Sequence, residues 1–179
     1  MKRIVSLFAA VAMTVVMGAS AVEAQSPVRF GLAGGLTLPT GEDKDFVDNG
    51  FHGQVMLGFG MMALPVKLRA DLSYHSFGGK DNTLAEDADI RVISGAVNAI
   101  AGMGGIGVKP YLTGGLGMYN TKIEAFGEDD TSTDVGINGG IGLEFSLTGM
   151  STFLEARYIY IFTEDEATKI IPITFGIMF

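Results

Sequence analysis

The chain has 179 residues, no cysteine and a formal net charge of −8. Its length fits a single domain, and without cysteine no disulfide framework can hold the fold. The acidic balance argues against nucleic acid as a partner.

The first 24 residues are predicted to be a cleaved signal peptide. Lys2 and Arg3 form a basic start, and a largely apolar, uncharged run covers residues 4–17. Val22-Glu23-Ala24 fits a small-x-small cleavage site, which leaves residues 25–179 as the mature domain. The alternative is a membrane-anchoring helix, but the run is shorter than the roughly 20 apolar residues that a helical span needs. No later stretch resembles a transmembrane helix, so this chain would enter a membrane as strands.

In seven segments apolar residues alternate with polar or small ones, which is the period of β-strands. The apolar faces of the first three segments are Val28, Phe30, Leu32, Leu36 and Leu38; Val55, Leu57, Phe59 and Met61; and Val66, Leu68, Ala70, Leu72 and Tyr74. Those of four later segments are Leu112, Leu116 and Met118; Val135, Ile137, Ile141, Leu143 and Phe145; Leu154, Ala156, Tyr158, Tyr160 and Phe162; and Ile171, Ile173, Phe175, Ile177 and Phe179.

One more segment, residues 89–101, does not keep a single alternation. Arg91 and Asn98 can share its polar face only if a bulge intervenes, and Gly95 is the expected position. With this segment the sequence predicts eight strands.

The predicted connections alternate in length. Those at residues 62–65, 102–107 and 147–151 are short, whereas residues 39–52, 78–87 and 120–133 form long loops and 163–168 an intermediate one. Short turns on one side and longer loops on the other are typical of outer membrane barrels, in which the short turns are periplasmic. An even number of strands then places both termini on the short-turn side.

Charged strand residues fall on the face opposite the apolar one. In a soluble barrel this face would be solvated and the apolar face would line the core. Here the charged faces are also rich in glycine, which suits a cramped interior better than a solvated surface. These residues are Arg29, Lys67, Arg69, Asp71, Lys109, Glu144, Glu155 and Arg157.

Aromatic residues on the apolar faces gather near the two expected rims. Phe30, Phe59, Phe145 and Phe179 fall near one end, and Tyr74, Tyr158, Tyr160 and Phe162 near the other, as expected for the girdles at bilayer interfaces. Together with the charges, they favour an all-β, eight-stranded antiparallel up-and-down transmembrane β-barrel over a soluble barrel.

Three stretches resemble the small outer membrane β-barrel family of the OmpX and OmpA transmembrane-domain type. Residues 109–117 are similar to its fifth strand, and Gly142-Leu143-Glu144-Phe145 with Glu155-Ala156-Arg157-Tyr158 to its sixth and seventh. The resemblance covers the whole predicted mature chain. It implies that Phe175, Ile177 and Phe179 form a C-terminal signal for the barrel-assembly machinery. It does not specify a function, because the family includes proteins with several roles.

The strongest candidate site is a charge network in the lumen. A turn near Gly149-Met150 places Glu144 and Glu155 opposite or one diagonal step apart, with Arg157 on the same face. Paired buried carboxylates need a cation between them. They could serve acid/base catalysis, but in so narrow a barrel a structural plug is favoured. The full predicted network is Arg29, Lys67, Arg69, Asp71, Glu144, Glu155 and Arg157; with Lys109 and Arg91 the strand charges are net cationic.

No catalytic residue is predicted. His75 shares an inner face with Ser73 and Asp71, but spacing alone does not establish the alignment that a nucleophile and its base require. A structural histidine is the favoured interpretation, and no cofactor is expected.

The predicted loops and strand tops hold 16 of the 19 acidic residues of the mature chain and four lysines. These acids are either a solvated face or a site where divalent cations bridge to lipopolysaccharide phosphates. Glu128, Asp129 and Asp130 are weak candidates for such a metal contact, and no stretch has EF-hand spacing.

The sequence therefore predicts a monomeric barrel with a filled lumen in the outer membrane of a Gram-negative-type bacterium, with outer membrane lipids as partners. We expect an envelope-structural or surface-interaction role. A narrow pore or transport barrel is the second hypothesis, and a lipid- or peptide-modifying enzyme the third.

Overall fold

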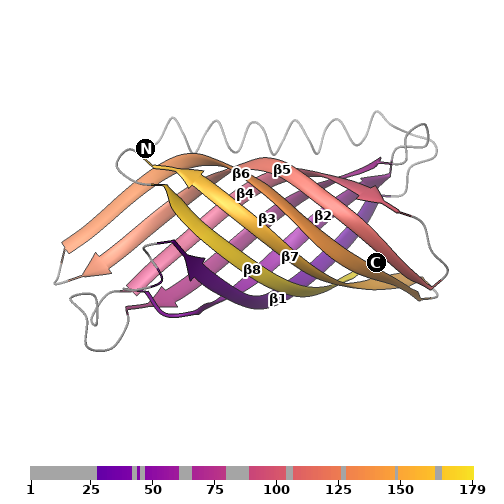
Figure 1. The fold of residues 1–179 in the computed structure, drawn as a ribbon, viewed down its shortest axis with the longest axis horizontal. Coiled ribbons are helices and arrows are strands. Elements are labelled where there is room, and N and C mark those ends of the chain that lie inside the picture. The colour runs from indigo at the N-terminus through magenta and orange to yellow at the C-terminus, as the bar shows by residue number, and fades with distance from the viewer. Residues whose placement is uncertain are drawn as a thin grey trace.

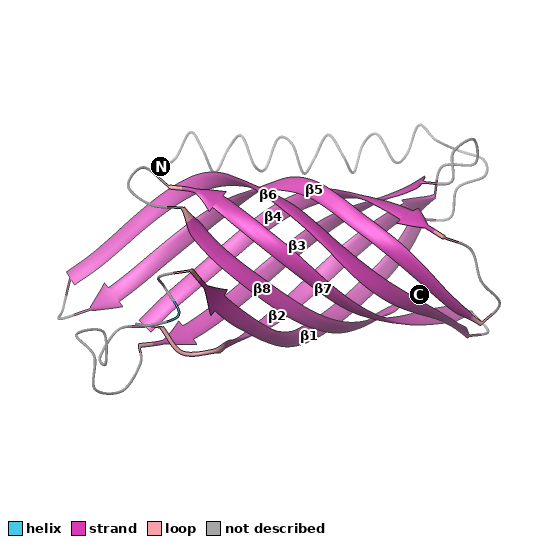
Figure 2. Cartoon of the chain, in the orientation of Figure 1, coloured by secondary structure: helices cyan, strands magenta, loops and turns pink. Residues whose placement is uncertain are grey.

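The computed structural model describes residues 28–41, 44, 47–60, 66–79, 89–103, 107–125, 128–147, 149–163 and 167–179. The predicted signal peptide lies outside these residues. Eight strands make up the fold (Figures 1 and 2): β1 (Val28–Thr40), β2 (Gly50–Gly60), β3 (Val66–Gly78), β4 (Asp89–Gly102), β5 (Val108–Ala125), β6 (Glu128–Leu147), β7 (Met150–Phe162) and β8 (Thr168–Met178).

The strands form one closed antiparallel barrel, as predicted. Each strand pairs with the next along the chain, and β1 also pairs with β8. The last residue takes part in this closure, because the backbone amide of Phe179 donates a hydrogen bond to the carbonyl of Phe30 at 2.7 Å. Because the barrel is closed, its wall has no unpaired strand edge. A β-structure that crosses a membrane must have no such edge in contact with lipid. Among the residues described, no helix is long and apolar enough to cross a membrane.

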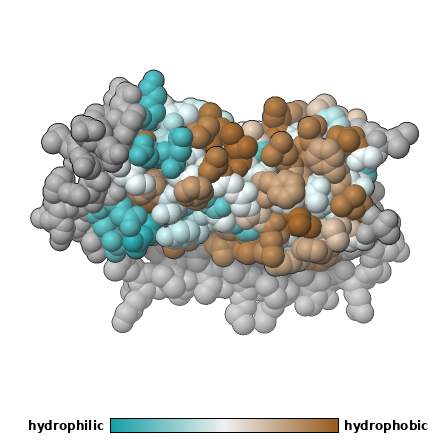
Figure 3. Space-filling view, turned by 90° about the horizontal axis from the view of Figure 1, so that it is seen from below, coloured by the Kyte–Doolittle hydropathy of each residue, from teal (hydrophilic) through white to brown (hydrophobic). Residues whose placement is uncertain are grey.

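Apolar residues cover the outside of the barrel and polar residues fill the inside. Leu116 and Ile141 are 68% and 65% exposed, whereas Thr174 and Asn98 are fully buried. The space-filling view has hydrophobic residues over much of the wall and hydrophilic ones gathered toward one end (Figure 3). The predicted faces of seven strands are therefore confirmed.

Strand β4 differs from the prediction. Its register with β3 and β5 runs without interruption through Gly95, which pairs with Leu72 and with Met118, so no bulge is present there. Arg91 and Asn98 consequently lie on opposite faces, and Arg91 points outward. The prediction failed because Arg91 lies near the end of the barrel wall, where an outward charge need not be buried in lipid.

The hairpin of β5 and β6 is longer than predicted. Residues 120–133 were expected to form a loop, but β5 continues to Ala125 and β6 begins at Glu128, with the two strands paired as far as Ala125 and Glu128. This hairpin projects beyond the neighbouring strands at the left of Figure 1. The β1–β2 loop is also shorter than predicted, since β1 runs to Thr40 and β2 begins at Gly50, whereas the β3–β4 loop keeps its predicted length between Gly78 and Asp89.

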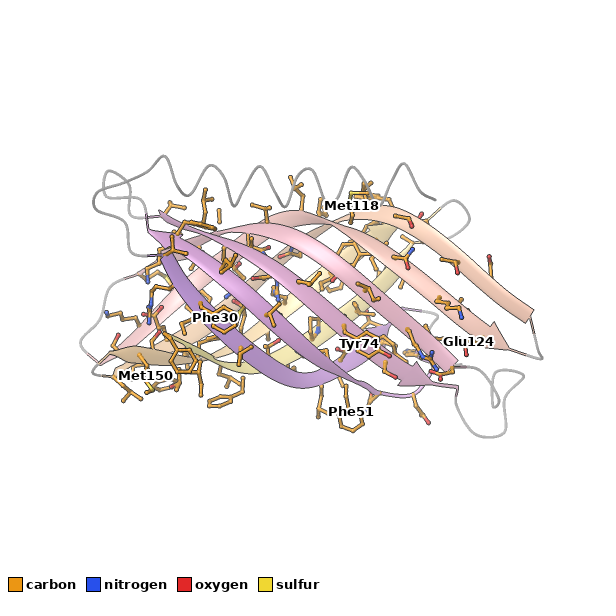
Figure 4. The ribbon with its side chains drawn as sticks, turned by 180° about the vertical axis from the view of Figure 1, so that it is seen from behind. Phe30, Phe51, Tyr74, Met118, Glu124 and Met150 are labelled. Carbon is orange, nitrogen blue, oxygen red and sulfur yellow. The ribbon has the colours of Figure 1, made fainter. Side chains whose placement is uncertain are left out.

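The two ends of the barrel differ, and we name them by their connections. The turn end carries the connections β2–β3, β4–β5 and β6–β7, together with Val28 and Phe179; the loop end carries the other four connections. Figure 4 places Phe30 and Met150 toward the turn end, and Tyr74 and Glu124 toward the loop end.

Candidate functional site

Four charged side chains form an ion-pair network across the lumen. The Arg69 guanidinium contacts Glu155 at 2.7 Å and Asp71 at 2.9 Å, and Arg157 contacts Asp71 at 2.9 Å and Glu155 at 3.0 Å. Each side chain is at most 5% exposed. Two cations and two anions therefore alternate, and each buried charge has two opposite charges beside it. This arrangement offsets the desolvation that burial would otherwise impose on each charge.

Neutral polar groups complete the network. The Tyr111 hydroxyl donates to Glu155 at 2.8 Å, the Asn98 amide donates to Asp71 at 2.8 Å, and Arg157 donates to the Gln54 amide oxygen at 2.9 Å. A Cβ at Gly142 would overlap the Tyr111 ring. Glycine on the inner face of β6 thus gives a large side chain from β5 room to reach Glu155.

The structure does not bring all the predicted lumen charges together. Glu144 accepts from Lys67 at 3.3 Å, and this pair is separate from the four-charge network. Glu144 pairs with Phe153 and Glu155 with Gly142 in the register of β6 and β7, so the two carboxylates lie one diagonal step apart, as predicted. The prediction that Arg157 is the nearest cation of both is wrong, because Arg157 joins Glu155 and Asp71 while Glu144 meets Lys67. Glu144 thus lies one step nearer the turn end.

A second polar cluster joins two histidines through one threonine. The Thr37 hydroxyl lies 3.0 Å from Nδ1 of His52 and 2.9 Å from Nδ1 of His75, and Nε2 of His52 lies 2.9 Å from the Thr174 hydroxyl. Because Thr37 has one proton, it can donate to one ring only and must accept from the other. His75 therefore finds its partner on β1 instead of in Ser73 of its own strand, and its ring stacks on Phe77.

Sequence reasoning missed this cluster because residues 39–52 were assigned to a loop. His52 has the same parity as Gln54 along β2, and that parity would have indicated an inward histidine. Its partner Thr37 could not be predicted, because the contact depends on how far β1 and β2 are shifted along each other.

Apolar residues close the lumen above the histidines. Phe77, Val92, Tyr119, Ile159, Ile161 and Ile170 form a buried cluster toward the loop end. A smaller cluster of Met56, Tyr111 and Phe153 lies on the other side of the ion pairs. From turn end to loop end, the lumen thus holds an apolar layer, an ion-pair layer, a histidine layer and an apolar layer.

A group of exposed charges marks the outer surface at the loop end. Arg91 contacts Asp89 at 2.6 Å and Glu124 at 3.4 Å, and Lys122 contacts Glu124 at 2.5 Å. These residues sit on the outward faces of β4 and β5, above the apolar wall. They mark the level at which the outside of the barrel becomes polar.

The predicted metal candidates lie on the projecting hairpin. Asp129 pairs with Glu124 and Asp130 with Ile123 in the register of β5 and β6, and the Asp130 carboxylate accepts from the amide of Thr131. Within the described parts of the chain, no three histidine or acidic side chains come close enough together to hold a metal ion. The side chains of Glu128 and Asp129 lie outside the description.

The residues of the predicted assembly signal follow the outer face at the end of β8. Phe175 is 57% and Phe179 52% exposed, and Ile177 is half-buried on the same face. Their recognition by the assembly machinery stays a prediction.

Comparison with known proteins identifies the architecture. The family model of the outer membrane protein beta-barrel domain matches residues 8–179. The chain belongs to this family. It is thus an outer membrane β-barrel protein of the Gram-negative envelope, as the resemblance in the sequence predicted.

Solved structures of three other outer membrane proteins have a fold similar to that of this chain. Neisserial surface protein A is 17% identical with a TM-score of 0.68, over 87% of this chain and 98% of its own. The N-terminal barrel of Pseudomonas aeruginosa OprF is 18% identical with a TM-score of 0.54, over 87% and 100%. The outer membrane enzyme PagL is 17% identical with a TM-score of 0.55, over 84% and 97%. No curated protein sequence matches the chain. At these identities the likeness establishes the fold alone.

Proposed function

We propose that this outer membrane barrel conducts nothing and acts at its acidic loop end, in an envelope-structural or surface-interaction role. The observation that carries the first part is the layered lumen. Four buried charges satisfy one another across it, and an apolar cluster closes it toward the loops. In a barrel of eight strands the interior has room for little more than side chains. A permeating ion or solute would have to break this network.

We propose no catalytic role for the lumen histidines. Both ring nitrogens of His52 and Nδ1 of His75 are hydrogen-bonded to Thr37 or Thr174, and both rings are buried beneath the apolar cluster. A substrate in the outer leaflet would not reach them. PagL is an enzyme on a similar fold, but similarity of fold alone does not carry activity from one barrel to another.

The proposed orientation places the turn end and both termini in the periplasm, with the loops outside. It is supported by the contrast between the three short turns at one end and, at the other, the long connections β1–β2 and β3–β4 and the projecting β5–β6 hairpin, which is the usual sidedness of these barrels. The protein is proposed to act as a monomer, because its strands close on one another without a second copy.

The charges of the protein are separated along its axis. Counted along the sequence and with Arg91 on the outside, the loop-end connections and the strand ends beside them hold 16 acidic and five basic residues, while five basic and three acidic residues fall on the inward strand faces. So many carboxylates at one end repel one another unless cations compensate, and salt screens exposed charges only beyond about 10 Å at 0.1 M. We propose that Mg²⁺ or Ca²⁺ shared with lipopolysaccharide phosphates supplies this compensation.

The surface role is tested by removing three charges from the tip of the hairpin. The variant Glu128→Gln/Asp129→Asn/Asp130→Asn should lose a large part of the gain in thermal stability that Mg²⁺ gives in membranes containing lipopolysaccharide. The matched control is Glu144→Gln, which removes an acid at the turn end and should keep the full gain. If the triple variant responds to Mg²⁺ like the wild type, these acids are a solvated face and the proposed bridge is wrong.

A further inference from the structure

A cavity opens at the turn end, on the opposite side of the ion pairs from the histidines. Its volume is about 170 Å³, slightly larger than an apolar cavity of about 150 Å³ that holds one benzene molecule. Part of the space exists because Gly58 and Gly60 present no side chain to the lumen. A Cβ built at Gly60 would meet nothing within 4 Å. A small chemical group could therefore occupy the cavity without moving the wall.

Three cations line this cavity: Arg69 of the ion-pair network at its inner end, and Arg29 and Lys67 nearer its entrance. The Arg29 guanidinium donates to the Ser151 hydroxyl and to the Met178 carbonyl, each at 3.0 Å. Within the part of the chain described, those neutral oxygens are its partners. The Lys67 ammonium contacts Glu144 at 3.3 Å, and its side chain is 53% exposed. With Arg29, Lys67 and Glu144, the entrance thus has one cation more than it has anions. The Arg29 guanidinium can form a charge-assisted hydrogen bond with an anion.

Apart from the charged residues and Tyr111, the lining is apolar or glycine. Ile100 and Phe153 line the cavity from within the lumen. Phe59 and Leu68 also line it, although they belong to the outward faces of β2 and β3 and pair with each other in the register of these strands. The cavity therefore opens beside the lipid-facing wall at the turn end of β2 and β3.

We propose that this cavity binds the phosphate head of an anionic phospholipid from the leaflet around the turn end. The phosphate lies between Arg29 and Lys67, and the lipid tail stays outside the barrel, on the wall formed by Phe59 and Leu68. A soluble anion could bind the two cations but would make no contact with the lipid-facing wall beside them. A zwitterionic lipid would add its own positive charge to an entrance that is already cationic. The cavity itself does not depend on the membrane orientation proposed above. That orientation decides only whether the leaflet around the turn end is the periplasmic one.

The test is lipid retention by the refolded barrel in nanodiscs of equal parts phosphatidylglycerol and phosphatidylcholine, measured by native mass spectrometry. The wild type should keep one phosphatidylglycerol in preference to phosphatidylcholine. Gly60→Leu fills the cavity and Arg29→Gln/Lys67→Gln removes the two cations at its entrance. Removing the cations should weaken that retention by about tenfold or more, because a charge-assisted hydrogen bond contributes roughly 1.5–3 kcal/mol. Filling the cavity should weaken it as much, because the phosphate is then kept away from the same cations. The control Gly53→Leu adds the same side chain to the same strand, where a Cβ also meets nothing within 4 Å, but on its outward face.

Each other result counts against the proposal. Equal retention of both lipids would show that head-group charge is not recognised. Retention unchanged in both variants would assign the lipid to the general shell around the barrel, and loss in Gly53→Leu would point to a site on the outer wall. Displacement of the lipid by inorganic phosphate at similar concentration would assign the cavity to a soluble anion. If Gly60→Leu fails to fold, as judged by the heat-dependent shift of the barrel on gels, the charge variant decides alone.

Discussion

The ion pairs of the lumen should be strongly coupled in a double-mutant cycle of Arg69 and Glu155. Glu155→Gln leaves two buried cations with only Asp71 between them, and Arg69→Met leaves two buried carboxylates with only Arg157. Breaking a buried pair by deleting one partner costs roughly 3–5 kcal/mol. The double variant restores neutrality, because Arg157 and Asp71 remain paired at 2.9 Å. It should therefore be more stable than the sum of the single losses predicts, with a coupling of at least about 2 kcal/mol.

The free energy of unfolding of each variant is measured by denaturant titration of the refolded protein in lipid vesicles. Lys67 and Glu144 supply the control cycle, since they are 3.3 Å apart but 53% and 19% exposed. Exposed pairs couple by about 0–1 kcal/mol. Single losses at Arg69 and Glu155 that add up to within about 0.5 kcal/mol of the double variant would refute the shared network.

Two other expectations follow from the faces and the ends of the barrel. Leu116→Arg and Ile141→Arg should each lower the free energy of unfolding in vesicles by about 2–4 kcal/mol if they lie near the bilayer centre; tolerance of Leu116→Arg comparable to that of a loop substitution would contradict its lipid-facing position. In intact cells a membrane-impermeant thiol reagent should label Asp165→Cys in the β7–β8 connection of the loop end but not Ala63→Cys in the β2–β3 connection of the turn end, and labelling of the second would reverse the proposed orientation.

The strand faces could be predicted because a period of two and the separation of charged from apolar residues are local properties of the sequence. They gave the correct inward side for Arg69, Asp71, Glu155 and Arg157. The same reasoning failed at Arg91. Charged strand residues have to face inward only where the outside of the barrel contacts lipid, and the sequence does not show which residues lie at that level. It also failed for the β5–β6 hairpin, because strands that extend into water need not alternate.

The contacts between side chains across the lumen could not be predicted from the sequence, for a different reason. Glu155 meets Arg69 from the far side of the barrel, and Thr37 meets both His52 and His75, because closure and strand register bring these residues to one level. The distances between these side chains depend on the summed register shifts of all eight strands. The cavity at the turn end has the same origin, since it combines Arg29 of β1 with Lys67 of β3 and Phe153 of β7.

The central claim, a lumen filled by side chains and joined across its width by buried ion pairs, is tested most directly by single-channel recording of the refolded wild-type protein in planar bilayers. A filled lumen predicts no steady current step above the bilayer baseline at any moderate voltage. Reproducible steps of uniform amplitude in the wild type, with an amplitude that changes in a lumen variant such as Ile161→Arg, would contradict it and make the protein a pore.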